Sequence, residues 1–218
     1  MRTQGLSLGC VFFMFVINLP EADPWYNSAL FTAVISTLSA IAALLLNEGL
    51  HNKRTRKKEL ESYISHLQIA DDEVNFYLKK IQTLIVESEA LMETIQNDGI
   101  GSPSFDLHLA FLEQSKIVIS GFNRSREVIS SLGEVHFELE HIRKKLKNIE
   151  HMVFNCEHPV QQRFKNALNQ NYKNLIKCIN GLSPKMTFLL SQLEQERTKT
   201  KNEIISLDLI HPIGFIDF

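Results

Sequence analysis

The sequence predicts an all-α protein: an N-terminal transmembrane helical hairpin, followed by a long, cytoplasmic, antiparallel three-helix bundle of the coiled-coil type. Three observations lead to this prediction. Residues 1–50 contain only four charged side chains, five basic side chains then fall within six positions, and the remainder has apolar residues at heptad spacing. Residues 59–218 hold 17 basic and 22 acidic side chains. The basic run at 53–58 therefore separates an apolar block from an acidic one.

Residues 25–47 form the clearer membrane segment, because these 23 residues carry no charge. A helix of this length covers a hydrocarbon core of about 30 Å at about 1.5 Å per residue. Trp25 and Tyr26 begin the segment, and such rings favour the interface. The sequence across the end of this segment is ALLLNEGLHNKRTRKKELE, residues 43–61. The basic residues of the juxtamembrane segment 51–58 indicate that this end lies on the cytoplasmic side of the membrane. We expect the bases of this segment to contact anionic lipids: Lys53, Arg54, Arg56, Lys57 and Lys58.

Residues 4–19 form a second uncharged stretch, which has two interpretations. It is either a short transmembrane helix that returns through the turn PEADP at 20–24, or a cleaved signal peptide. A signal peptide needs small residues before its cleavage site, whereas Asn18, Leu19 and Pro20 occupy those positions. We therefore favour the hairpin. Both termini would then be cytoplasmic, in a multi-pass protein of the inner membrane.

The predicted helix at 25–47 carries small residues on one face. They recur at spacings of four, three, four and three: Ala29, Ala33, Ser36, Ala40 and Ala43. Small side chains let helices approach closely in lipid, where no hydrophobic force drives helices together. Gly5 and Gly9 give the first stretch a matching face. The pattern fits packing within the hairpin and self-association of several chains equally well.

A bundle of three amphipathic helices is predicted over 59–206, with neighbours antiparallel because their connections are short. The first helix, 59–97, has a stripe with four- and three-residue spacing: Leu60, Ile64, Leu67, Val74, Leu78, Ile81, Ile85, Met92 and Ile95, widened by Tyr63, Ala70, Tyr77, Leu84 and Leu91. We expect this helix to be continuous, or nearly so, with the predicted helix at 25–47.

The second and third bundle helices are predicted at 103–155 and 159–206, each opened by a proline. The second stripe is Val128, Leu132, Val135, Leu139, Ile142, Leu146, Ile149 and Val153. The third stripe is Leu168, Tyr172, Leu175, Ile179, Leu182, Met186, Leu189 and Leu193. NGLSP at 180–184 should kink or split the third helix. The apolar tail at 207–218 lacks the heptad pattern, and we expect it to pack against the bundle.

The sequence indicates no catalytic, cofactor or metal site. His151, Cys156 and His158 are residue types that bind zinc, but the fourth ligand is missing. Glu138 and His141 have the spacing used in di-iron bundles, which need a second such unit that the sequence lacks. We predict a protein that is not an enzyme and takes no cofactor, metal or small-molecule substrate.

A second basic cluster lies within the predicted helix at 103–155. Its members are Arg143, Lys144, Lys145 and Lys147. One interpretation is pairing with acidic side chains of neighbouring helices. The other is contact with a phosphate backbone or a partner protein, which salt would weaken. The acidic balance of residues 59–218 argues against general nucleic-acid binding and leaves room for one local patch.

The arrangement of the chain carries the only resemblance to a known family. A hairpin at 4–47, a basic stop at 53–58 and a helical remainder resemble the two-helix membrane effectors of bacterial anti-phage systems, in particular those encoded with retron reverse transcriptases. The resemblance implies toxin-like damage to the inner membrane after release from a cytoplasmic partner complex. It also implies a reverse transcriptase with its RNA–DNA product as the partner. The alternative is a non-enzymatic, membrane-tethered coiled-coil scaffold or adaptor.

Overall fold

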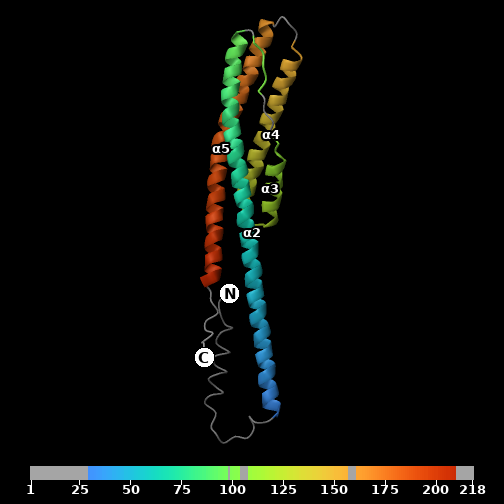
Figure 1. Cartoon of the computed structure of the whole chain (residues 1–218), viewed down its shortest axis with the longest axis vertical. Coiled ribbons are helices and arrows are strands. Elements are labelled where there is room, and N and C mark those ends of the chain that lie inside the picture. Colours follow the sequence, from blue (N-terminus) through green and yellow to red (C-terminus); the bar gives the residue numbers. More distant parts are fainter. Residues whose placement is uncertain (1–28, 98, 104–107, 157–160, 210–218) are drawn as a thin grey trace. The chain divides into compact units, whose positions relative to one another are not determined.

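The computed structural model describes residues 29–97, 99–103, 108–156 and 161–209. These residues contain four helices and no strand (Figure 1): α2 (Ala29–Gln96), α3 (Ala110–Gly121), α4 (Arg126–Phe154) and α5 (Gln162–Leu209). The all-α prediction is therefore confirmed. The predicted helix at 4–19, the turn at 20–24 and most of the tail at 207–218 lie outside the described residues.

The chain divides into two units, 1–54 and 55–218. The described part of the first unit is a single stretch of α2, whose side chains are exposed or half-buried. This stretch makes α2 long and apolar enough to cross a membrane, and its most apolar part is not buried in the structure. Thr37 Oγ1 donates a hydrogen bond of 2.8 Å to the carbonyl oxygen of Ala33. This hydroxyl therefore has a partner within its own helix.

The predicted continuity between the membrane segment and the first bundle helix is confirmed, because α2 runs unbroken from Ala29 to Gln96. This range contains no proline, and Gly49 is its only glycine, so nothing in it interrupts the helix strongly. The helix ends where the N–H groups of Asn97 and Gly99 both donate to the carbonyl oxygen of Thr94, each at 3.0 Å.

The second unit has one hydrophobic core, to which α3, α4, α5 and the later part of α2 all contribute. The predicted stripes at 103–155 and 159–206 are confirmed. The buried residues of α4 are Val128, Leu132, Val135, Leu139, Ile142, Leu146 and Ile149, with Val153 half-buried. Those of α5 include all eight predicted residues, from Leu168 to Leu193.

The apolar stripe of α2 is centred on other residues than predicted. Tyr63, Ala70, Tyr77 and Leu84 are buried, whereas Ile64, Leu78 and Ile85 are only half-buried. Each of the two buried tyrosine rings contributes a large apolar area to the core. The hydroxyl of Tyr77 donates to the carbonyl oxygen of His108, outside α2.

The prediction of one helix over 103–155 is wrong, because the chain leaves the helix between α3 and α4. Asn123 has a φ of 49°, in the left-handed region that asparagine tolerates better than most residues. Ser125 then begins α4 as its N-cap, its side chain accepting from the Val128 N–H at 3.4 Å. The shorter α3 buries Leu112 and Ile119 in the core.

Of the kink or split predicted near 180–184, the split is wrong, since α5 continues through Pro184. A proline removes one backbone hydrogen bond from a helix interior. On both sides of it, however, Leu182 and Met186 are buried in the core. Packing of this apolar stripe stabilises the helix more than local propensity opposes it.

Candidate functional site

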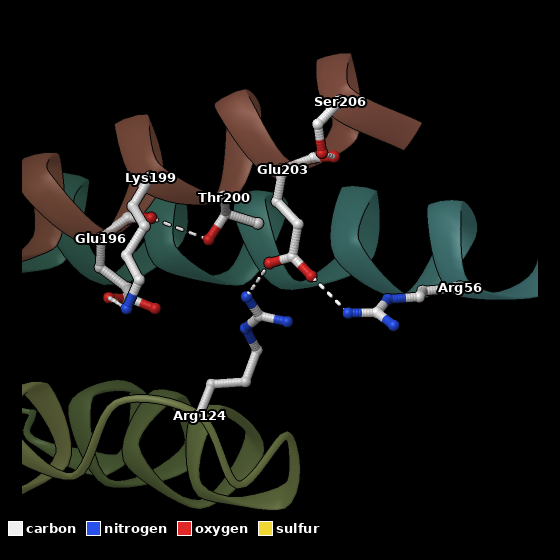
Figure 2. Close-up of polar contacts among 7 residues, drawn as sticks. All are labelled: Arg56, Arg124, Glu196, Lys199, Thr200, Glu203 and Ser206. Atoms are coloured by element: carbon white, nitrogen blue, oxygen red, sulfur yellow. Dashed lines mark hydrogen bonds and ion pairs between the residues drawn. The ribbon is translucent and has the colours of Figure 1, made fainter. Parts of the chain in front are cut away.

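The core stripe of α5 becomes polar beyond Leu193. The same four- and three-residue spacing leads from Leu193 to Glu196, Thr200 and Glu203. Glu196 is only 9% exposed and Thr200 is fully buried. Core positions rarely hold carboxylates unless these are paired. We call the following residues the Glu203 layer (Figure 2): Arg56, Arg124, Glu196, Thr200 and Glu203.

Glu203 joins three segments of the second unit. Arg56 of α2 places Nη2 2.7 Å from Oε1 of Glu203, and Arg124 from the α3–α4 connection binds Oε2. Figure 2 shows the two arginines approaching the carboxylate from different elements. Charge-assisted bonds of this kind are stronger than neutral ones. The connection between α3 and α4, which divides the predicted helix, therefore carries one of the partners of Glu203.

Aromatic rings support Arg124. Its guanidinium carbon lies 5.5 Å from the centre of the Tyr63 ring, within the range of a cation–π contact. The rings of Tyr63 and Phe122 have centres 5.0 Å apart. Burial of Tyr63, reinforced by the nearby negative charge of Glu196, raises the pKa of its hydroxyl to about 12. Tyr63 therefore remains neutral over the ordinary pH range and acts as an apolar support.

Hydrogen bonds from Arg124, and then from Arg56, lower the pKa of Glu203 below its ordinary value of 4.5. A carboxylate with a lowered folded-state pKa contributes stability that is complete above its unfolded-state pKa. This contribution is lost as the pH falls through the folded-state pKa. The Glu203 layer therefore holds its segments together at neutral pH and loosens in acid.

Glu203→Gln should lower the stability of the second unit at neutral pH by on the order of 1 kcal/mol, because charge-assisted bonds are lost and the site is partly exposed. The stability difference between the two proteins should shrink as the pH falls well below 4.5, the ordinary pKa of the carboxyl group. Thermal unfolding of wild type and variant at several pH values measures both effects. A difference that does not change with pH would show that the Glu203 charge contributes nothing.

In the structure, two of the five bases predicted to contact lipids form ion pairs with carboxylates of α5. Besides the Arg56–Glu203 pair, Lys57 Nζ lies 2.8 Å from Oδ2 of Asp208, and this hydrogen bond raises the pKa of Lys57. Arg54 and Lys58 are exposed, and Lys53 is half-buried. Exposed ion pairs contribute little because solvent screens them. The bases of this segment can therefore exchange one acidic partner for another.

The small-residue face of α2 is open. Ala33, Ser36, Ala40 and Ala43 are all exposed, and the side chain of Ala29 lies outside the described ones. A face of this kind in lipid allows another helix to approach closely.

The second basic cluster is only partly neutralised. Arg143 pairs with Glu140 of its own helix at 3.3 Å, while Lys144 and Lys147 are exposed and Lys145 is half-buried. Lys147 lines a shallow surface pocket together with Ser102, Glu150, His151, Val153 and Phe154. The pairing of Arg143 is thus within α4 and not with a neighbouring helix.

Two of the residues considered for metal binding, Glu138 and His151, contact other side chains. Among the described residues, no group of three His, Cys, Asp or Glu side chains could hold a metal ion. Glu138 accepts from Lys185 at 3.1 Å, and His151 contacts Asn155 of its own helix. His158 lies outside the described residues.

The residues missed by the sequence analysis are Glu196, Thr200, Glu203 and Arg124. Extending the α5 heptad beyond Leu193 would have placed the first three at core positions. Nothing comparable indicates Arg124, because its role depends on the turn at Asn123.

No protein-family model matches the chain, and neither curated proteins nor solved structures match it. The fold and the site alone therefore define its class. It is an all-α protein whose helix α2 is suited to crossing a membrane and also contributes to the core of a helical unit.

Proposed function

We propose that this protein is a membrane-anchored effector that damages or permeabilises the bacterial inner membrane when a cytoplasmic partner complex releases it. The observation that carries the proposal is the continuity of α2. One helix contains an exposed apolar segment with a small-residue face and also supplies core residues to the second unit. A partner that alters the packing of the second unit thus acts on the helix that enters the membrane.

The proposed topology is a hairpin with helices at 4–19 and 25–47 and with both termini cytoplasmic. The basic residues after the second helix support this orientation. The proposed bundle is antiparallel. Its support is a series of contacts between α2, or the segment just after it, and α5: Arg56 with Glu203, Gln68 with Arg197 and Gly101 with Tyr172. Residue numbers rise on one side of this series as they fall on the other.

The proposed setting is anti-phage defence of the retron type, with a reverse transcriptase and its RNA–DNA product as the restraining partner. The architectural resemblance supports this setting. The exposed bases Lys144 and Lys147 offer a phosphate contact on the second unit, and such a contact would weaken as salt rises.

Expression of the chain without its partners should depolarise bacterial cells, because no partner complex then restrains the membrane helices. A dye that reports inner-membrane permeability, followed after induction, measures this effect. Co-expression of the neighbouring genes should suppress the signal. Cells that remain polarised at high protein levels without any partner would contradict the effector function.

The topology predicts the behaviour of fusion reporters. A reporter that works only in the cytoplasm should be active after Phe218, and one that works only outside should be active within the turn at 20–24. Neutral replacement of the five bases between Lys53 and Lys58 should weaken this orientation, since positive residues are retained inside. A shortened N-terminus in the mature protein would instead support the signal-peptide interpretation.

A membrane-tethered scaffold is the second candidate function. Large apolar side chains on the second unit favour it, because Phe137, Phe154 and Phe188 are 71%, 88% and 60% exposed. Exposed apolar groups of this size are typical of surfaces that bind other proteins. A scaffold would leave cells polarised when expressed alone, whereas an effector would not.

A further inference from the structure

Arg56 and Lys57 lie close in sequence to the proposed membrane segment and form ion pairs within the second unit. Arg56 lies nine residues after the uncharged segment ends at Asn47, and Lys57 is next in the chain. Anionic head groups attract bases placed close to a membrane helix. In the structure, however, both bases form ion pairs with carboxylates of α5: Arg56 with Glu203 and Lys57 with Asp208.

These two pairs can open without leaving a buried charge. When Arg56 leaves Glu203, Arg124 still binds the other oxygen of that carboxylate. The side chain of Arg56 is 61% exposed, and those of Lys57 and Asp208 are 37% and 54% exposed. All these groups remain hydrated or paired after separation, so the penalty of an orphaned buried charge does not arise. The contacts are therefore suited to exchange.

We propose that Glu203 and Asp208 form an autoinhibitory contact that competes with the phosphate groups of anionic phospholipids for Arg56 and Lys57. When zwitterionic lipids surround the protein, α5 holds this part of α2. Anionic lipids take over the two bases and release α2 from the end of α5. This inference rests on the membrane location in the proposed function and adds a lipid-dependent control to it.

The test measures the separation of α2 and α5 in the full chain, incorporated into lipid nanodiscs. Spin labels are attached at Ser62→Cys and Asn202→Cys, two exposed positions on these helices. The native cysteines Cys10, Cys156 and Cys178 are replaced by serine. Nanodiscs contain either phosphatidylcholine alone or a mixture with phosphatidylglycerol. We expect a short, narrow distance distribution in the first and a shift to longer distances in the second.

Variants identify the groups responsible. Arg56→Gln combined with Lys57→Gln should abolish the response to phosphatidylglycerol. Neither the carboxylates of α5 nor the lipid phosphates can then form ion pairs at these positions. Glu203→Gln combined with Asp208→Asn should give the longer distances in phosphatidylcholine alone. The matched control, Lys173→Gln with Lys177→Gln, removes the same charge from exposed positions on α5 that are distant in sequence from Glu203 and Asp208. It should respond to phosphatidylglycerol like the wild type, and circular dichroism checks that each variant is folded.

A further measurement distinguishes a response to lipid phosphate from a response to free phosphate. Inorganic phosphate is added to phosphatidylcholine nanodiscs, and sodium chloride of equal ionic strength serves as the control. A shift with free phosphate would overturn the assignment to lipids. An unchanged distance in phosphatidylglycerol, or an equal response after loss of Arg56 and Lys57, would overturn the autoinhibitory contact while leaving the effector function standing. Failure of the protein to enter either nanodisc would overturn both.

Discussion

Leu139→Asp should abolish cooperative unfolding of the second unit. Leu139 is fully buried in the α4 stripe, within the single core of this unit. An aspartate there either ionises without a partner or forces water into the core, and we expect a loss of at least about 3 kcal/mol. Urea unfolding of the purified full chain in detergent, followed by far-ultraviolet circular dichroism, measures the change. The expected result is a broad transition that begins at low urea.

Phe137→Asp is the matched control, because it places the same charge on the same helix two residues earlier. Phe137 is exposed, so its replacement removes little buried area and leaves the charge in water. We expect a change within about 1 kcal/mol. Similar losses from the two substitutions would show that the α4 stripe does not face the core as described.

Enlarging the small-residue face of α2 should remove toxicity without removing the protein from the membrane. In a variant that combines Ala33→Leu, Ser36→Leu and Ala40→Leu, the added side chains keep neighbouring backbones apart, while the segment stays apolar enough to insert. All three positions are exposed in the structure and therefore open to another helix. The permeability dye should then report polarised cells, with the protein present in the membrane fraction at wild-type levels.

The control for this experiment enlarges the opposite side of the same segment. Leu38→Phe and Leu45→Phe add volume where the helix would meet lipid, and both positions are exposed. These variants should depolarise cells as the wild type does. If the small-face variant is equally toxic, the damage does not depend on close helix packing at this face.

The sequence by itself determined the elements whose residues repeat most regularly. The stripes of α4 and α5 were predicted correctly from Val128 to Ile149 and from Leu168 to Leu193. A first bundle helix continuous, or nearly so, with the segment at 25–47 was predicted as well, and α2 runs through both. Periodicity suffices to predict the buried residues of these segments because the same face of the helix is buried at every turn.

Only the tertiary structure decided the remaining features, and each depends on contacts between distant residues. Tyr63 lies at the centre of the α2 stripe because Phe122 and Arg124 pack against its ring. The turn at Asn123 divides the predicted helix at 103–155 and places Arg124 beside Glu203. α5 passes through Pro184 because the core holds both sides of it. Local propensity cannot predict such features, because packing and charge pairing across the fold determine the conformation at these positions.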